Sequence, residues 1–480
     1  MIRHNCGVCL THSLHDVYSF TESLQHRGRE AVGIVAIGDQ GINGVKWLGN
    51  VGRLSRDSLA RILGGTNYHT YLGHVRYATK GDKDIKNLLY DAHPHVVGGE
   101  IQDNGNHIVI KNAEAAIVHN GHIDNSFFKD LDKRKLKTDC DSEKLLHYFI
   151  ENGANRVIEE ITGSYVAAIA DNHRKEVIVL RDKTGLRPGI LGIKDGRHGM
   201  ASEDIAFLQN GGKILQDLIP GSVYYFDNIG GYRKKKVSKP EIKHCMFEYQ
   251  YLAHENSILN RINTRVHREI LGEILAEEVS WKDFNFVTYL PESPRLAARS
   301  FSEITGLPFI EMFYKMRKER SFQGSTKLSR ENSIGDNLFL STSVKDKVRG
   351  KRGILIDDSG VRGNNAKRAR QLAYEDAEVE EMLYTLYTPQ IGIIGEDGIS
   401  RGCTNGVDMP PEHPIDHFMA RDHENKKNRT LKEIGDLIKM PVHYISQEGL
   451  FRAFNRQLGI TKEDLCYFCI GGPTPFVLPK

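Results

Sequence analysis

The chain has 480 residues, of which 39% are hydrophobic and 26% charged, and its formal net charge is +3. This composition is typical of a soluble globular protein with two or three domains, and it gives no sign of a nucleic-acid-binding surface or a membrane span. The start, MIRHNCGVCL, has no apolar signal core, so a cytoplasmic location is expected. In that reducing setting, the seven cysteines indicate catalytic, ligating or buried roles rather than a disulfide framework.

The first half of the chain, up to about residue 240, is rich in short β patterns. Gly and Asp turns separate these runs, which are predicted strands at residues 114–121, 163–171, 176–182 and 221–227. Two amphipathic patterns predict helices over residues 15–28 and 142–153.

The second half changes to an alternation of helices and strands. The predicted order is helix 267–279, strand 284–290, helix 291–306, strand 353–358, helix 364–377 and strands 381–388 and 442–446. Such alternation favours a largely parallel sheet covered by helices, with ligands at the carboxyl ends of the strands. The segments PES (291–293) and DDS (357–359) lie at two of these ends, so they are expected to converge.

Five short segments of the first half carry a family resemblance in their order and spacing. They are CGV (6–8), LQHRGREAVGI (24–34), GHVRYATKG (73–81), VHNGHIDN (118–125) and CDSEKLL (140–146). Together they resemble the class II glutamine amidotransferases, whose fold is a β-sandwich between helix layers. The resemblance implies that Cys6 is the nucleophile and that its free α-amine, which titrates near ~8, is the base. A propeptide of residues 1–5 would then have to be removed.

The same resemblance assigns the glutamine pocket. It implies that Arg76 pairs with the α-carboxylate of glutamine, that Asp141 accepts from its α-ammonium, and that Arg27 supports the pocket. Asn120 and the backbone N–H of Gly121 would form the oxyanion hole. His122 stands where the family usually has Asn.

The stretch GILIDDSGVRGNNAKR (353–368) resembles the phosphoribosyl diphosphate signature of type I phosphoribosyltransferases. The resemblance implies Mg²⁺ near Ser293, Asp357 and Asp358, because hard oxygen ligands suit this ion. The residues it implies for binding phosphoribosyl diphosphate are Lys315, Asp357, Asp358, Ser359, Arg362, Gly363, Asn364 and Asn365. Backbone N–H groups of the loop and a helix N-terminus would hold the 5′-phosphate.

Two departures from the family pattern lie at this acceptor site. Asn364 and Asn365 replace two hydroxyl residues, and the basic loop at residues 314–323 lacks the family's Tyr and Gly. The sequence therefore predicts glutamine hydrolysis from nearly unaltered motifs and the phosphoribosyl acceptor from altered ones.

Joined in one chain, the two halves resemble the glutamine phosphoribosyl diphosphate amidotransferases, which carry out the first step of purine synthesis. The implied fold is an α+β N-terminal-nucleophile (αββα) domain followed by an α/β type I phosphoribosyltransferase domain. The expected boundaries are 6–240 and 241–452, with a cysteine-bearing tail at 453–480. The resemblance also implies purine nucleotides as candidate feedback inhibitors, a homo-oligomer, and no nucleic-acid or membrane partner.

Four cysteines outside the glutamine motifs form a further set: Cys245, Cys403, Cys466 and Cys469, the last two in CYFC. Four thiolates suffice for a 4Fe–4S cluster or a zinc ion. Some members of the family carry such a cluster at these positions, so the resemblance implies an iron–sulfur cluster, with zinc left open.

Two other functions remain open at this point. One is a paralogue that delivers ammonia from glutamine to a different phosphorylated acceptor. The other is a non-catalytic nucleotide sensor on the phosphoribosyltransferase fold, although such a sensor would not need the Cys6 set of residues.

Overall fold

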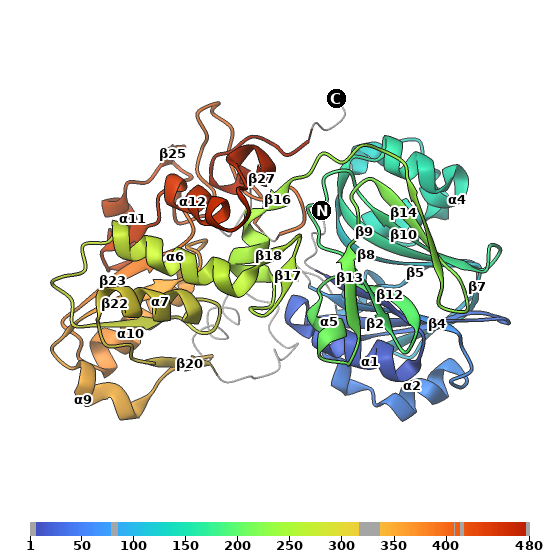
Figure 1. The fold of residues 1–480 in the computed structure, drawn as a ribbon, viewed down its shortest axis with the longest axis horizontal. Coiled ribbons are helices and arrows are strands. Elements are labelled where there is room, and N and C mark those ends of the chain that lie inside the picture. Colours follow the sequence, from blue (N-terminus) through green and yellow to red (C-terminus); the bar gives the residue numbers. More distant parts are fainter. Residues whose placement is uncertain (1–5, 78–84, 316–336, 408, 413–416, 477–480) are drawn as a thin grey trace.

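The computed structural model describes residues 6–77, 85–315, 337–407, 409–412 and 417–476. The expected propeptide, residues 1–5, and residues 316–323 of the basic loop lie outside this part of the chain. Figure 1 shows two lobes: a first lobe from β1 to β15, coloured blue to green, and a second lobe coloured yellow to red.

The first lobe is built on two antiparallel sheets, which within the described residues have nine and six strands. The nine-stranded sheet runs, in spatial order, through β13 (Lys213–Asp217), β11 (Ile190–Lys194), β12 (Arg197–Ala201), β1 (Gly7–Thr11), β4 (Thr70–Arg76), β2 (Ala31–Gly38), β3 (Gly41–Leu48), β7 (His107–Ala113) and β6 (Glu100–Asp103). The six-stranded sheet runs through β15 (Tyr232–Lys236), β14 (Ser222–Phe226), β10 (Glu176–Arg181), β9 (Gly163–Asp171), β8 (Ala115–Ile123) and β5 (His95–Val97).

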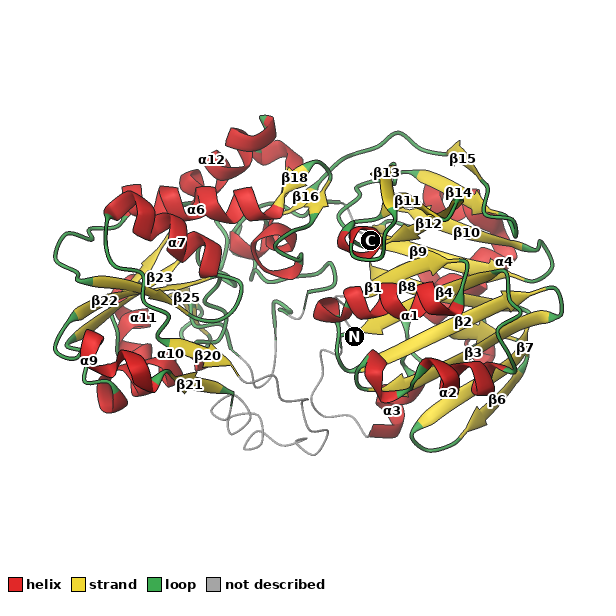
Figure 2. Cartoon of the chain, turned by 60° about the horizontal axis from the view of Figure 1, so that its bottom comes forward, coloured by secondary structure: helices red, strands yellow, loops and turns green. Residues whose placement is uncertain are grey.

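The apolar side chains of these strands alternate between two layers, as the period of a strand requires. Val8, Leu10 and Leu72 pack against Val118 and Ala168 in the layer between the sheets. The outer faces are covered by α1 (Leu14–Ser23) and α2 (Arg56–Leu63) on one sheet and by α4 (Asp141–Glu160) on the other. Figure 2 shows α1 and α2 lying along the nine-stranded sheet. The order helix–sheet–sheet–helix is the predicted αββα fold.

The second lobe contains a parallel four-stranded sheet in the order β19 (Phe286–Tyr289), β22 (Arg352–Asp357), β23 (Glu381–Leu386) and β26 (Val442–Tyr444). One face packs under α6 (Thr264–Glu278), α7 (Arg295–Thr305) and α12 (Gln447–Leu458), and the other under α10 (Asn364–Gln371) and α11 (Leu431–Ile438). Both faces are covered, as parallel sheets require, and the predicted α/β fold of this half is confirmed.

Three predicted helices differ from the observed ones at their ends. The helix expected over 15–28 ends at Ser23, and Gln25–Arg27 forms a 3₁₀ turn, because the Gln25 side chain accepts from the Val51 N–H (2.7 Å). The helix expected over 142–153 breaks at Gly153 (φ 79°), where it was expected to end, and a second helical segment then runs to Glu160. The helix expected over 364–377 changes to a π turn at Leu372–Asp376. Long-range contacts and backbone irregularity, which the local pattern does not encode, decide these ends.

The shorter elements connect and extend the sheets. They are α3 (Ile85–Tyr90), α5 (Ile205–Leu208), β16 (His244–Cys245), a π turn (Glu248–Leu252), β17 (Ile258–Leu259), β18 (Ile262–Asn263), β20 (Phe313–Lys315), β21 (Leu338–Leu340), α9 (Lys345–Val348), β24 (Arg421–Asp422), β25 (Lys427–Asn428) and β27 (Leu465–Cys466). The domain boundaries at 240/241 and 452/453 stay predictions.

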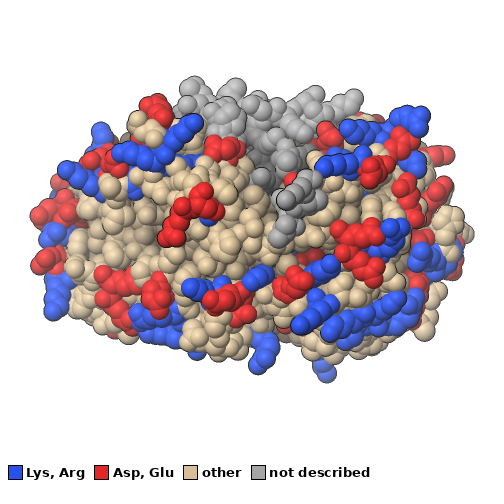
Figure 3. Space-filling view, turned by 90° about the horizontal axis from the view of Figure 1, so that it is seen from above, with Lys and Arg blue, Asp and Glu red and all other residues tan. Residues whose placement is uncertain are grey.

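The surface carries charges of both signs. On the face seen in Figure 3, Lys and Arg side chains are interspersed with Asp and Glu side chains. Among the helices that the structure describes, none has both the length and the apolar character needed to cross a bilayer.

Candidate active sites

Cys6 lies fully buried directly before β1 and has a basic neighbourhood. The Arg27 Nε–H donates to the Cys6 carbonyl oxygen (3.0 Å), and the Arg27 guanidinium is itself paired with Glu203 (2.5 Å) and Glu248 (2.6 Å). Burial raises the pKa of the Cys6 thiol to about 12, against the opposing effects of the Tyr77 backbone and of Arg76, Arg187 and Arg27. The thiol is therefore not ionised by its surroundings, and a nearby base is needed to activate it.

Arg76 ends β4, the strand that pairs with β1, and is 1% exposed. Its Nη1–H donates to the Leu88 carbonyl oxygen (2.6 Å), and Nη2 lies 3.8 Å from a carboxylate oxygen of Asp91. Its Nε is buried and has no hydrogen-bond partner within the described part of the chain. A buried guanidinium with an unused donor suits an anionic ligand.

Asn120 and Gly121 lie side by side on β8, in the facing sheet. The Asn120 side chain is fully buried, and neither its nitrogen nor its oxygen has a partner among the described residues. At Gly121 (φ 155°), a Cβ would overlap the Ser164 carbonyl oxygen, so only glycine fits. A contact joins β8 to β4: Nε2 of His74 on β4 lies 3.2 Å from the carbonyl oxygen of His119 on β8.

Asp141 begins α4, which packs against β8. One carboxylate oxygen accepts from the Ile123 N–H (2.9 Å) and lies 3.6 Å from Nδ1 of His122. Burial raises the pKa of Asp141 to about 6, partly offset by hydrogen bonds from Ile123, Cys140 and Ser142. A cation bound at this carboxylate would restore its charged form.

The two acids of the DDS segment lie at the carboxyl end of β22, and both are buried. Asp357 accepts from the Tyr384 hydroxyl (2.5 Å) and from the Asp358 N–H (2.8 Å), while Asp358 accepts from the Ser359 hydroxyl (2.6 Å). Burial and the neighbouring Asp357 raise the pKa of Asp358 to about 8. Two adjacent buried carboxyls resist ionising together unless a cation joins them.

The other predicted acceptor residues surround this edge of the sheet. Ser293 follows β19, whose Tyr289 pairs in register with Ile356 of β22, so both strands end at the same edge. Lys315 ends β20, and its charge partly opposes the burial that raises the pKa of both acids. Arg362 lies in the loop that follows the acids.

Helix α10 follows that loop and begins with Gly363 at its N-cap position. Within the part of the chain that the structure describes, no side chain caps this N-terminus, and Asn364 and Asn365 are exposed in its first turn. Its first backbone N–H groups therefore have no partner within the helix and can serve an anion.

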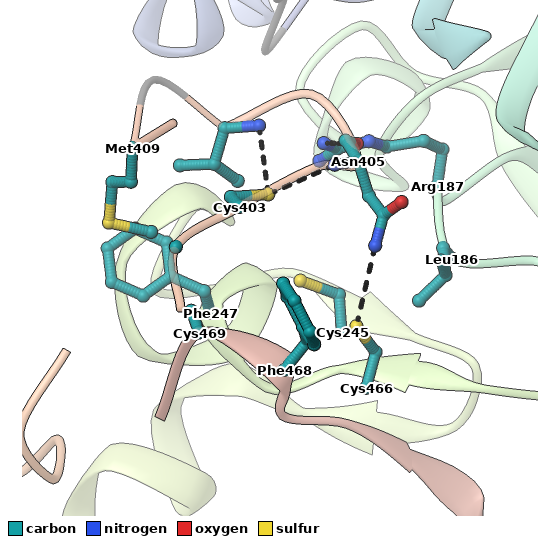
Figure 4. A pocket seen from close by; sticks show the side chains of 12 residues that line it. Leu186, Arg187, Cys245, Phe247, Cys403, Asn405, Met409, Cys466, Phe468 and Cys469 are labelled. Carbon is teal, nitrogen blue, oxygen red and sulfur yellow. Dashed lines mark hydrogen bonds between the residues drawn. The ribbon is translucent and has the colours of Figure 1, made fainter. Parts of the chain in front are cut away.

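All four predicted ligand cysteines line one pocket (Figure 4). Cys245 on β16 and Cys466 on β27 are register partners of a parallel pair, Cys469 follows in a 3₁₀ turn, and Cys403 comes from a loop. Burial raises the pKa values of Cys245, Cys466 and Cys469.

N–H donors point at two of these sulfur atoms. Asn405 N and Val407 N donate to Cys403 Sγ (3.3 Å each), and Asn405 Nδ2 lies 3.8 Å from Cys466 Sγ. Within the described residues, no three His, Cys, Asp or Glu side chains are placed to hold a single metal ion.

Comparisons with known proteins agree with both halves. A family model for a glutamine amidotransferase domain matches residues 99–220. The amidophosphoribosyltransferase of Archaeoglobus fulgidus is 31% identical over 473 residues, which cover 95% of this chain and 93% of that protein. The chain belongs to the amidophosphoribosyltransferase family.

Further members of the amidophosphoribosyltransferase family are similar to this chain, in sequence or structure, over nearly its whole length. The Bacillus subtilis enzyme is 27% identical and covers 95% of this chain. A solved structure of glutamine phosphoribosylpyrophosphate amidotransferase from B. subtilis, in complex with ADP and GMP, superposes with a TM-score of 0.79 at 26% identity, covering 98% of this chain and 97% of its own.

Three residues near the proposed glutamine site of this chain were not predicted from its sequence. Glu203 and Glu248 lie in matched segments, ASEDIAF and MFEYQYLA, but only the fold shows that both pair with Arg27. Lys46 is a single cation in the apolar run GVKWL and lies in none of the motifs that match the family.

Proposed function

We propose that this chain makes 5-phosphoribosylamine from glutamine and phosphoribosyl diphosphate, the first step of de novo purine biosynthesis. The first lobe hydrolyses glutamine, and the ammonia passes to the second lobe. The main support is the presence of both sites in one family member: buried Cys6 held by Arg27, and the acid pair at the carboxyl edge of the parallel sheet.

Glutamine hydrolysis would start at Cys6. After removal of residues 1–5, the α-amine of Cys6 accepts the thiol proton, and the sulfur attacks the side-chain amide carbon of glutamine. The side-chain amide of Asn120 and the N–H of Gly121 donate to the resulting oxyanion. The C–N bond breaks and ammonia leaves with the transferred proton. Water then cleaves the thioester, which releases glutamate and restores the thiol.

The α-groups of glutamine would be held on either side of this centre. Arg76, whose buried Nε–H has no partner among the described residues, binds the α-carboxylate, and Asp141 accepts from the α-ammonium. The bound ammonium would lower the raised pKa of Asp141 and keep it ionised at neutral pH.

In the second lobe, Asp357, Asp358 and Ser293 would hold Mg²⁺ with the diphosphate. When bound, this ion neutralises charge on the leaving diphosphate. The backbone N–H groups at Gly363, Asn364 and Asn365 would bind the 5′-phosphate at the start of α10, with Ser359, Arg362 and Lys315 nearby. Ammonia then forms a bond to C1 of the ribose as the bond from C1 to the diphosphate breaks.

The cysteine pocket would hold a 4Fe–4S cluster, with zinc as the alternative. Support comes from the four cysteines that line one pocket and from the N–H donors to Cys403 Sγ. When bound, the cluster would link β16, the 403–409 loop and the tail through its sulfur ligands.

Purine nucleotides would act as regulators of this chain. The support is the B. subtilis neighbour, which was solved with ADP and GMP. Assembly into a homo-oligomer stays a prediction.

The deciding assay supplies glutamine labelled with ¹⁵N at its amide, together with phosphoribosyl diphosphate and Mg²⁺. We expect pyrophosphate release, glutamate and label in the phosphoribosylamine product, with ammonia able to replace glutamine. Glutamate formation without pyrophosphate release would instead support a paralogue with a different phosphorylated acceptor. Failure of both reactions in folded protein would support a nucleotide sensor.

A further inference from the structure

A charged side chain, Lys46, points into the apolar layer between the two sheets of the first lobe. It lies on β3 and is 6% exposed. Its neighbours along the strand on the same face, Gly44 and Leu48, carry no charge. Burial lowers the pKa of Lys46 to about 7, and the charge of Arg76 lowers it further, while Asp91, Cys140 and Glu143 act in the opposite direction. Such a group needs compensating contacts.

Two backbone carbonyls supply those contacts. The Lys46 ammonium donates to the carbonyl oxygens of Tyr90 and Ala92, at 2.7 Å each. Tyr90 is the last residue of α3, where carbonyls lack partners within the helix. The two bonds therefore fix the end of α3, and the residue between them, Asp91, against β3.

The nine-stranded sheet leaves room for the residues that follow α3. His74, Gly33 and Lys46 are register partners on β4, β2 and β3, so they share one face of the sheet. A Cβ at Gly33 would overlap the His93 carbonyl oxygen, and the His93 ring packs on His74 with centroids 4.0 Å apart. The segment that follows α3 thus lies directly on this row.

Arg76 depends on the same segment. Its Nη1–H donates to the Leu88 carbonyl oxygen near the end of α3, and its Nη2 lies 3.8 Å from the carboxylate of Asp91. Leu88 and Asp91 lie on either side of Tyr90, to which Lys46 is bonded.

We propose that Lys46 is a positioning residue for glutamine recognition: it holds the Tyr90–Ala92 backbone against β3, and that backbone orients Arg76 toward the α-carboxylate. This inference rests on the proposed role of Arg76 and extends it to a residue that touches no substrate. A misplacement of Arg76 by about 1 Å is enough to lose much of its contribution.

The test compares glutamine with its α-carboxamide analogue, which lacks the carboxylate that Arg76 would bind. With phosphoribosyl diphosphate present for both substrates, glutamate formation gives kcat/KM for glutamine, and formation of glutamate α-amide gives kcat/KM for the analogue. The preference for glutamine is their ratio. In Lys46→Met, we expect this preference to fall by about tenfold to a hundredfold, mainly through a raised KM for glutamine, because carboxylate binding is lost in ground and transition states alike.

Two variants calibrate the result. Arg76→Met should remove the preference entirely. Ile108→Met changes the register partner of Lys46 on β7, in the same apolar layer, and should leave the preference intact. A role of Lys46 in packing alone would lower activity toward both substrates equally and keep their ratio.

The outcomes separate the two ideas. If Arg76→Met keeps the preference, the proposed carboxylate site is wrong. If Arg76→Met loses it while folded Lys46→Met keeps it, the positioning role of Lys46 is overturned. Should Lys46→Met not fold, Lys46→Gln carries the test, because its side chain is uncharged and one atom shorter and therefore weakens the bonds to the Tyr90 and Ala92 carbonyls. An undiminished preference in folded Lys46→Gln would equally overturn the inference.

Discussion

Cys6 occupies a buried position that disfavours its reactive thiolate form. The residue is fully buried, and burial raises the pKa of its thiol to about 12. Neighbouring arginines reduce this effect but do not reverse it. Chemistry at neutral pH therefore requires a local base, which the α-amine of a chain beginning at Cys6 would provide.

Cys6→Ala should abolish glutamine-dependent product formation while leaving ammonia-dependent formation within about twofold, because only the glutaminase loses its nucleophile. Pyrophosphate release with either nitrogen source measures this. Cys9→Ala is the matched control, since Cys9 is equally buried on β1 but contacts Thr21 (3.6 Å) rather than Arg27.

Loss of both activities in Cys6→Ala would point to misfolding instead of a lost nucleophile. The intact mass of active enzyme should correspond to a chain that begins at Cys6. An active chain that still carries residues 1–5 would contradict the α-amine mechanism.

The acid pair at residues 357–358 should release protons when it binds its ligand. Burial and Asp357 raise the pKa of Asp358 to about 8, so the free chain favours the protonated form of this carboxyl near neutral pH. A bound cation favours the carboxylate, so the proton leaves on binding. Affinity for Mg²⁺ and phosphoribosyl diphosphate should therefore rise about tenfold per pH unit below pH ~8 and level off above it.

Calorimetry in buffers of different ionisation enthalpy measures both the affinity and the released protons. Asp357→Asn with Asp358→Asn should remove binding, whereas Asp436→Asn, an exposed acid on α11, should not change it. Binding that is independent of pH between 6 and 9 would show that this pair does not meet the cation.

At the scale of elements, a pair of two-residue strands places two of the cysteines that line the pocket. The parallel pairing of β16 with β27 places Cys245 and Cys466 in register, and the 3₁₀ turn after β27 adds Cys469. Strands this short contribute little stability alone. Their geometry is therefore expected to depend on the group that the cysteines bind.

Cys466→Ser should lower the thermal midpoint of anaerobically purified enzyme by several degrees while changing the KM for glutamine less than twofold, because the pocket holds the tail and not the substrate. Unaltered protein should contain about four irons per chain if the cluster is complete. Scanning calorimetry and iron analysis give these values, and Cys9→Ala serves as the control outside the pocket. Stoichiometric zinc in colourless anaerobic protein would contradict the cluster.

At the scale of the whole molecule, a buried polar network joins the lobes. Arg27 beside Cys6 pairs with Glu248, which lies in the π turn after β16, and Glu248 also pairs with Arg187 (3.3 Å). Arg187 donates to the Asn405 carbonyl oxygen (2.5 Å), and Asn405 adjoins two cysteines of the pocket. The nucleophile and the cysteine pocket thus lie on one chain of contacts.

Glu248→Gln should destabilise the enzyme by about 3–5 kcal/mol, because it removes the shared carboxylate of two buried guanidiniums. Glutamine-dependent activity should fall more than ammonia-dependent activity at low temperature, since Arg27 bonds to the Cys6 carbonyl. Glu273→Gln, which breaks an exposed pair with Arg456, should cost less than about 1 kcal/mol. Equal thermal midpoints for the two variants would refute a stabilising role for the network.

The sequence alone determined features that local pattern encodes. Apolar alternation predicted β8, β9, β10 and β14, and the alternating helices and strands predicted the parallel sheet of the second lobe. Cys6, Arg76 and the DDS segment could be selected because each lies in a short, distinctive run. Their proposed roles come from a family resemblance and are still to be tested by the experiments above.

Only the tertiary structure decided which distant residues meet. No local pattern indicates that Lys46 bonds to the end of α3, or that Glu203 and Glu248 both reach Arg27. The physical reason is that such contacts, and the pKa shifts that follow from burial, depend on the packing of many segments at once. A short window of sequence records what one segment prefers, but not which partner it will be packed against.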